Sequence, residues 1–278
     1  MKVGVSLPVR ELKNDLETIK AFAVLAEEFG YSHLRIPDQV IRPNNNHLHE
    51  PMTLLSYIAA LTSRIELVPS VIVLPLRKTI EFARQATGVD ILSGGRLRLG
   101  IGVGSSQDEY RFMGVSFGQR GAFCNEQMAL LRQLWKKENV TFKGKWHHVN
   151  QAGINPLPIQ KPIPMWIGGQ ASPRSSVLKR IATLADGWFV LATPEEFDLI
   201  NEDIKKEADK IGRDFRSIGT EAGVAVVGDR GKKWQSRVEG WQKKNLSHLC
   251  LRTLGGGLTA GEHLDKLEEV IKIVPSDS

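Results

Sequence analysis

The sequence predicts an α/β protein, specifically a (β/α)8 or TIM barrel of eight parallel strands, each followed by a helix. Three observations carry this prediction. Short apolar runs alternate with amphipathic stretches along all 278 residues. There are eight of each, at about 35 residues per unit, and a barrel of this class takes about 250 residues. Leu7–Arg10 follows the first run without the glycine-rich turn that a doubly wound dinucleotide-binding sheet places there.

The expected strands are short apolar runs rich in Val, Ile and Leu. They span residues 2–7, 33–37, 65–74, 96–101, 164–168, 187–191, 219–227 and 248–252. The expected helices show the apolar period of a helix that packs on one face, as Leu16, Ile19, Ala23 and Ala26 do. They lie near residues 14–29, 51–62, 78–92, 119–136, 173–185, 195–211, 232–245 and 261–273.

Start and stop signals agree with these helices. Asn14-Asp15, Ser172-Pro173 and Thr193-Pro194 supply the side-chain oxygens and prolines that are typical of helix starts. Gly30 and Gly212 follow expected helix ends, where glycine readily takes the left-handed conformation.

One segment interrupts the alternation between the fourth helix and the fifth strand. Residues 137–162 are too many for a simple loop. Residues 140–149 predict a hairpin around Gly144, and four prolines between 156 and 164 predict an extended return to the barrel. We expect one barrel domain over residues 1–278, with this insertion at its rim either lining a pocket or forming an interface.

Composition excludes several classes of function. The net charge is +6, from 37 basic and 31 acidic residues, but the lysine pairs are mixed with acids as on solvated helices, so we expect no nucleic acid partner. No apolar stretch reaches the roughly 18 residues that span a bilayer, so we expect no membrane partner either. The distant Cys124 and Cys250 predict no disulfide framework and favour a cytoplasmic location.

Glycines at every second position mark the end of the fourth expected strand. Gly100, Gly102 and Gly104 lack a Cβ, so they let a ligand or another backbone approach closely. Two interpretations stay open at this point. The three glycines line a ligand, or they relieve crowding inside the barrel.

Active sites of such barrels lie where the strands end, which makes the residues there candidates. Asp38 follows the second strand and is placed to accept a ring N–H or to position a proton, or alternatively to cap a loop or a helix. Gly168-Gly169-Gln170 precedes a helix start. It suits either a phosphate on free backbone N–H groups or a tight turn with Ser172 as the cap.

Two other kinds of site are not supported. His47 with His49, and His147 with His148, are the only histidine clusters, and neither has carboxylates or cysteines at ligand spacing, so we predict no metal site. No glycine turn ends in the Gly-Lys-Ser/Thr of a nucleoside-triphosphate loop.

Four strings resemble the bacterial-luciferase-like family, the luciferase-like monooxygenase superfamily. They are Ser70–Arg77, Asp90–Gly104, Trp166–Gly169 and Leu184–Trp188, in the family's order. The similarity is greatest to the short, F420-dependent oxidoreductase branch, and it runs from the first strand to about residue 195. The resemblance implies a (β/α)8 barrel that holds the deazaflavin F420, or alternatively FMN, at the strand ends.

The resemblance also assigns residues to that cofactor. A bulge at Ser70-Val71, often with a non-prolyl cis peptide, would back the ring, and Asp38 and Gln39 would lie beside it as the catalytic pair. The remaining cofactor contacts would come from Val103, Gly104, Asp108, Gly168, Gly169 and Gln170, the last three at the phosphate-bearing tail.

Two departures bear on the reaction. Sugar-phosphate dehydrogenases of this family have a histidine after the aspartate of the second strand and a glutamate after the glycines of the fourth. Gln39 and Ser105 stand there in this chain. Because glutamine accepts no proton near neutral pH, alcohol oxidation by that pair is disfavoured.

We therefore expect an F420-dependent oxidoreductase that transfers hydride to or from a small organic substrate, with an activated double bond as the favoured acceptor. One alternative is an FMN-dependent luciferase-like monooxygenase that uses O2, and another is a non-catalytic F420- or flavin-binding protein. A homodimer is a further expectation, because dimers are common among such barrels.

Overall fold

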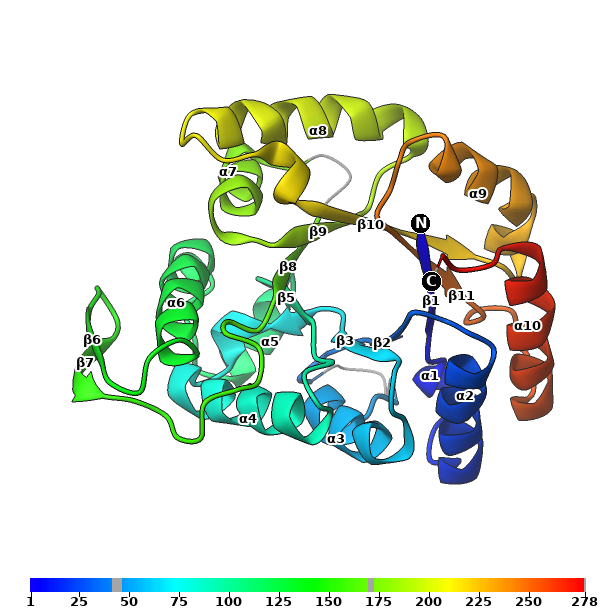
Figure 1. Cartoon of the computed structure of the whole chain (residues 1–278), viewed down its shortest axis with the longest axis horizontal. Helices are drawn as coiled ribbons and strands as arrows, with labels where there is room; N and C mark the ends of the chain where they lie inside the picture. The colour runs from blue at the N-terminus through cyan, green and yellow to red at the C-terminus, as the bar shows by residue number, and fades with distance from the viewer. Residues whose placement is uncertain (42–46, 170–172, 278) are drawn as a thin grey trace.

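A computed structural model describes residues 1–41, 47–169 and 173–277, and its parallel strands form a barrel surrounded by helices (Figure 1). The strand order is β3-β2-β1-β11-β10-β9-β8-β5-β4. The strands are β1 (Lys2–Ser6), β2 (His33–Ile36), β3 (Glu66–Pro69), β4 (Ile72–Val73), β5 (Leu99–Gly102), β8 (Met165–Gly168), β9 (Gly187–Val190), β10 (Gly219–Ala225) and β11 (His248–Arg252). The predicted eightfold (β/α) barrel is confirmed.

The third expected strand, residues 65–74, is broken into two pieces. β3 pairs with β2, β4 pairs with β5, and the Ser70–Val71 peptide between them is cis. A parallel bridge from Leu67 to Leu97 joins β3 to the segment before β5, so the ring closes. The prediction of one continuous strand was wrong here, while the break at Ser70-Val71 lies where the family resemblance put it.

The helices cover the outside of the barrel (Figure 1). They are α1 (Val9–Leu12), α2 (Leu16–Glu28), α3 (Pro51–Leu61), α4 (Thr79–Leu92), α5 (Gln107–Phe112), α6 (Arg120–Leu134), α7 (Ser175–Leu184), α8 (Pro194–Asp209), α9 (Trp234–Gln242) and α10 (Ala260–Ile273). Short 3₁₀ turns span Leu74–Leu76, Phe215–Ser217 and Asp229–Gly231. The sequence did not predict α1 and α5, because helices of four and six residues are too short to show a period.

Local signals explain several helix ends. Asp15 Oδ1 accepts a hydrogen bond from the Thr18 N–H at 3.0 Å, and Thr193 forms a capping box with Glu196. Gly30 and Gly212 end their helices at φ +86° and +68°. Ser172 lies outside the described residues, and α7 begins at Ser175.

The predicted hairpin is present as β6 (Val140–Lys143) and β7 (His148–Ala152), which pair antiparallel. It projects from the barrel beside α6 (Figure 1). Glu126 of α6 anchors it, because its carboxylate accepts hydrogen bonds from the N–H groups of Lys145, Trp146 and His147 at 2.7–2.9 Å. The tip of the hairpin is therefore fixed to α6, and His147 also bonds Thr79 of α4 at 2.7 Å.

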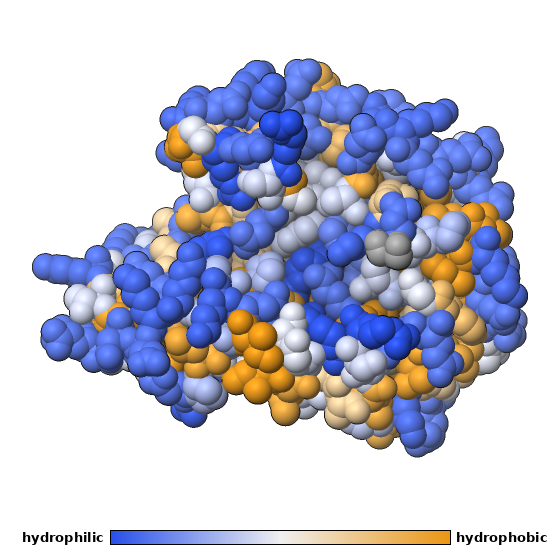
Figure 2. Space-filling view, viewed as in Figure 1, coloured by the Kyte–Doolittle hydropathy of each residue, from blue (hydrophilic) through white to orange (hydrophobic). Residues whose placement is uncertain are grey.

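The end of the barrel where the strands begin faces the viewer in Figure 1. Both chain termini lie beside β1, and the Met1 ammonium pairs with the Asp277 carboxylate. Figure 2 shows mostly hydrophilic side chains at this end, with hydrophobic ones gathered below, towards α3 and α4. Among the described residues no helix is long and apolar enough to cross a membrane.

Candidate functional site

The strand-end half of the barrel interior is lined by glycines. Side chains alternate along a strand, and Ile101 and Ile167 pack outward into the main core beneath the helices. Gly102 and Gly168, their neighbours, therefore face inward. Since glycine contributes no side chain, other groups can approach the backbone closely at these two positions.

The glycine series of β5 lies against the broken third strand. A Cβ at Gly100 would overlap the Pro69 carbonyl oxygen, and one at Gly102 would lie 2.6 Å from Val71 Cγ2. Gly104, at φ +65°, would place a Cβ 2.8 Å from Val73 Cγ1. The direct role of the three glycines is thus to let residues 69–73 approach, as the crowding interpretation held.

The same packing puts Val71 inside the barrel. Its side chain lies against Gly102 and also against Gly168, where an added Cβ would be 3.2 Å from Val71 Cγ1. Val71 is half-buried and packs on Val68, Trp166 and Phe189, a small cluster separate from the main core. The Val71 side chain therefore presents an apolar surface towards the end of the barrel where the strands end. We call this surface the ledge.

Below this ledge the interior is filled by a charged layer, defined as Glu66, Glu221, Arg98, Arg35 and His33. Arg98 donates to Glu221 at 2.8 Å and to Glu66 at 2.7 Å, and Arg35 donates to Glu221 at 2.9 Å. His33 Nε2 lies 3.3 Å from Glu221. Both carboxylates of the layer are therefore paired with cations, and neither is left to bind a positively charged ligand.

The layer shifts the pKa values of its members. Burial opposes ionisation of Glu221, but His33, Arg35 and Arg98 outweigh it and hold the pKa of that carboxyl well below its ordinary value. Burial, together with the positive charge of Arg98, lowers the pKa of the adjacent His248 to about 2. His248 therefore stays neutral in the folded protein.

His33, Glu221 and Cys250 bring possible metal ligands within 4.8 Å of one another. Two guanidiniums already bind the Glu221 carboxylate, and burial raises the pKa of the Cys250 thiol to about 11. A thiol that stays protonated beside two cations does not fit a metal ion. Cys124 is likewise free and buried with a pKa of about 11, so neither cysteine is a nucleophile at neutral pH.

Asp38 and Gln39 lie at the end of β2, on a cavity of about 240 Å³. Asp38 Oδ2 accepts from the Val73 N–H at 3.1 Å and Oδ1 from Arg77 at 3.0 Å. Burial raises the pKa of Asp38 and outweighs the opposing effect of Arg77. The side chain is 1% exposed, and its two bonds tie the end of β2 to β4 and to Arg77.

Gln39 differs from Asp38 in having an unused group. Its Oε1 is buried and accepts no hydrogen bond from any described residue. A buried acceptor without a donor is costly unless a ligand or water satisfies it. Gln39 is therefore the member of the predicted pair that is available to a ligand.

A larger cavity of about 700 Å³ adjoins this one, and Leu76, Arg77 and Met113 line both. The hairpin contributes Trp146 and His147 to its wall, and the His147 ring stacks on Phe123 at 5.5 Å. The insertion thus lines a pocket at the rim, which is one of the two roles expected for it.

Ser116, on the same cavity, lies in Gly114-Val115-Ser116-Phe117-Gly118, which has the Gly-x-Ser-x-Gly spacing of a hydrolase elbow. That elbow needs a strand-to-helix turn. This segment follows helix α5 instead, so it gives no support to a hydrolase.

The other predicted cofactor residues of the fourth strand lie after β5. The Val103 carbonyl accepts a hydrogen bond from Tyr110 at 2.6 Å. Asp108 lies on α5, exposed and paired with Arg111 at 2.9 Å. Its neighbour Glu109 is buried, and its carboxylate accepts from the Val40 N–H at 2.8 Å. Glu109, which the sequence did not single out, orders the loop after β2.

Gly169 serves the packing of neighbouring strands. Its N–H donates to the Phe189 carbonyl at 2.9 Å, and an added Cβ would overlap that carbonyl and the Trp188 ring. Gln170 lies outside the described residues. The close approach of Trp188 accounts for the glycine at 169, and a phosphate at Gly168-Gly169-Gln170 stays a prediction.

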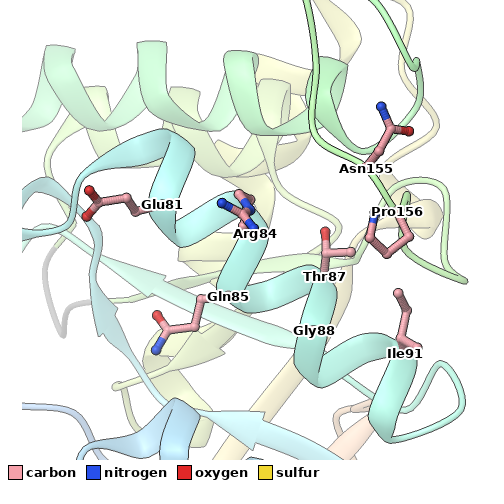
Figure 3. A pocket seen from close by; sticks show the side chains of 8 residues that line it. All are labelled: Glu81, Arg84, Gln85, Thr87, Gly88, Ile91, Asn155 and Pro156. Carbon is pink, nitrogen blue, oxygen red and sulfur yellow. The ribbon is translucent and has the colours of Figure 1, made fainter.

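A further cavity of about 400 Å³ lies on the outer side of α4, away from the barrel interior (Figure 3). α4 contributes Glu81, Arg84 and Thr87, and Asn155-Pro156 closes the other side. The Thr87 hydroxyl is buried without a partner among the described residues. None of the predicted site residues lines this cavity.

One end of the barrel is filled by the charged layer, and the other end, where the strands end, is lined by glycines. Barrels of this class bind their ligands at the strand ends. The luciferase-like monooxygenase family model matches residues 1–247, and the chain belongs to that family. It is a family of oxidoreductases and monooxygenases, as the names of its members below indicate.

Two curated relatives carry informative names. Pyrimidine monooxygenase RutA of Bradyrhizobium sp. is 36% identical over 69% of this chain and 55% of its own length. The F420-dependent glucose-6-phosphate dehydrogenase of Kineococcus radiotolerans is 33% identical over 65% of this chain and 54% of its own. The chain thus spans about half the length of these two relatives.

Solved structures show the same fold. The monooxygenase RslO1 of Streptomyces bottropensis superposes with a TM-score of 0.82 at 16% identity, over 99% of this chain and 98% of its own. An F420-dependent secondary alcohol dehydrogenase, bound to an F420-acetone adduct, gives 0.81 at 15% identity over 99% of both chains.

Proposed function

We propose that this protein is an F420-dependent oxidoreductase that transfers hydride from the reduced cofactor to a small organic substrate with an electron-poor double bond. The observation that carries the proposal is the ledge of Val71 between Gly102 and Gly168. A Cβ at either glycine would press on Val71, so the two glycines let the Val71 side chain reach into the barrel, where it would back a flat ring. F420 would supply the hydride when bound.

The predicted residues take the following roles in this proposal. Ser70 and Val71 back the ring, and Val103, Gly104 and Asp108 line the cofactor. Gly168, Gly169 and Gln170 meet its phosphate-bearing tail. The buried Gln39 Oε1 has no donor among the described residues, and in this proposal it accepts a hydrogen bond from a ring N–H. Asp38 would act at the ring's edge, held in place by Arg77.

The direction of transfer follows from proton chemistry. Gln39 and Ser105 supply no general base for removing the proton of an alcohol. Reduction of an activated alkene or imine makes smaller demands, because water can protonate the product. We therefore place this chain among reductases rather than alcohol dehydrogenases.

The match to pyrimidine monooxygenase RutA favours one other function, an FMN-dependent monooxygenase that uses O2. Gln39 and Ser105 in turn leave open a cofactor-binding protein without turnover. A cytoplasmic location and a homodimer belong to the proposal as well. The two free, buried thiols fit a reducing compartment.

Titration with each cofactor separates these functions. We expect F420 fluorescence to be quenched at one equivalent per chain, no FMN binding, and oxidation of reduced F420 by electron-poor alkenes or imines. Tight FMN binding with oxygen uptake would replace the proposal with the monooxygenase. Binding without turnover across the substrate panel would leave only a cofactor-binding protein.

A further inference from the structure

Arg252, the last residue of β11, has no partner for its charge. It is half-buried, its Nε is buried without a hydrogen bond, and it forms no ion pair or hydrogen bond with any described residue. Surface arginines meet water and buried ones meet carboxylates. The buried Nε of Arg252 is therefore a donor that no described residue uses.

The register of β11 directs this side chain into the barrel. Arg252 is paired with Ser6 of β1 and Ala225 of β10, both small. Its guanidinium lies over Gly223, where an added Cβ would be 3.5 Å from Nε and 3.7 Å from Cζ. The three atoms nearest to that position all belong to Arg252, so the guanidinium lies directly over the Gly223 backbone.

The charges around Arg252 are positive. Burial lowers its pKa, and the nearby Arg35, Arg230 and Arg237 lower it further. The carboxylates of the charged layer are already used, since Glu221 meets Arg35 and Arg98, and Glu66 meets Arg98. The carboxylates of the charged layer therefore do not compensate the positive charge of Arg252.

We propose that Arg252 binds an oxyanion of the substrate, a carboxylate or a phosphate, in the open half of the barrel. The planar fork of a guanidinium matches both groups with two parallel hydrogen bonds. The assignment of this anion to the substrate rests on the proposed function, because it assumes that a cofactor occupies the ledge at Val71. It narrows the substrate class to anionic compounds.

Thermal unfolding with inorganic phosphate as the probe tests the proposal on the protein without cofactor, at constant ionic strength in chloride. We expect phosphate to raise the wild-type Tm by about 3 °C at saturation, because it binds the native state alone. In Arg252→Met this response should vanish, and the Tm without phosphate should exceed that of wild type, since an uncompensated cation is gone. Arg216→Gln removes the same charge from a side chain that is 90% exposed, and it should respond as wild type.

Three outcomes would overturn the proposal. The first is an equal phosphate response in wild type and Arg252→Met. The second is a lower Tm of Arg252→Met together with no response in wild type, which is the signature of a purely structural arginine. The third is displacement of phosphate by F420 or FMN, which would show that Arg252 binds the phosphate of the cofactor and not an anion of the substrate.

The proposed function can fail separately. If neither cofactor binds, the hydride-transfer proposal falls, while the phosphate response still decides whether Arg252 holds an oxyanion.

Discussion

The two halves of the barrel interior differ in what fills them. The strand-start half holds the charged layer, where Arg98 and Arg35 bind Glu221. The strand-end half is lined by glycines and by the Val71 ledge, and Arg252, which lies at the same register level as Arg35, forms no ion pair with any described residue. In the first half the protein satisfies its own groups. In the second it leaves apolar surface and hydrogen-bonding groups for something else.

This contrast separates stability from binding. Changes in the charged layer should unfold the protein without any special effect on ligands. Changes at the ledge should affect ligands more than folding. The predictions below test that division in order of decreasing effect.

Glu221→Gln should have the largest effect, a loss of about 3–5 kcal/mol in the free energy of unfolding. The change removes the one carboxylate that Arg98 and Arg35 share, and leaves Glu66, which meets only Arg98, as the remaining acid of the layer. Chemical denaturation at pH 7 measures it. Glu66→Gln is the control, because Glu66 is 33% exposed and meets only Arg98, so its loss should be clearly smaller.

The same variant should change the response to acid. The folded pKa of Glu221 is below the unfolded value of about 4.5, so its stabilisation is present above pH 4.5 and is lost as the pH falls. Glu221→Gln should therefore flatten the acid limb of the stability curve. An unchanged slope would show that other groups dominate it.

Gly102→Ala should affect binding more than folding. The new Cβ would lie 2.6 Å from Val71 Cγ2 and displace the side chain that forms the ledge. We expect at least about a tenfold loss in cofactor affinity, or about 1.4 kcal/mol. Removing the overlap by adding Val71→Ala should recover any lost stability but not the affinity.

Gly88→Ala is the matched control for that experiment. A Cβ there meets nothing within 4 Å, and the residue lies inside α4. Affinity should be unchanged and stability slightly raised, because alanine is the better helix former. Equal loss of affinity in both variants would contradict the role given to the ledge.

His248 should give an effect on stability that depends on pH and is absent at pH 7. Its folded pKa of about 2 is below the unfolded value of 6.5, so stability is intact above pH 6.5 and falls below it. The slope is at most about 1.4 kcal/mol per pH unit. His248→Gln should remove this slope in urea unfolding between pH 4 and 6.5, and a slope equal to that of wild type would contradict it.

Glu126→Gln should have the smallest effect on the whole protein. An amide offers one oxygen where the carboxylate accepts from Lys145, Trp146 and His147, so the hairpin should loosen from α6. We expect faster hydrogen exchange over 144–147 with a change in unfolding free energy under about 1 kcal/mol. Glu81→Gln, at a 75% exposed side chain, should change neither quantity.

Much of the fold was predictable, because periodicity and capping act locally. Apolar period and caps placed the strands and the major helices, and Gly144 marked the hairpin. The break between β3 and β4 was not visible in that pattern, because the residues before Ser70 and those after it are equally apolar. Only the family resemblance pointed to Ser70-Val71.

The site was predictable in position more than in detail. Strand ends gave Asp38 and the glycines, but sequence could not show that Arg77 and Val73 occupy both Asp38 oxygens. Arg35 and Arg252 were missed, although a charged residue at an inward strand position is a readable signal. Whether each of these arginines finds a carboxylate depends on residues far away in the sequence, and no local sequence pattern predicts such pairs.

A crystal structure of the protein with F420 would test the central claim most directly. The account predicts the deazaflavin ring against Val71, with Gly102 and Gly168 beside it, and the charged layer unchanged beneath. A ring bound in the cavity between α4 and Asn155-Pro156, or outside the barrel against Trp146, would contradict it.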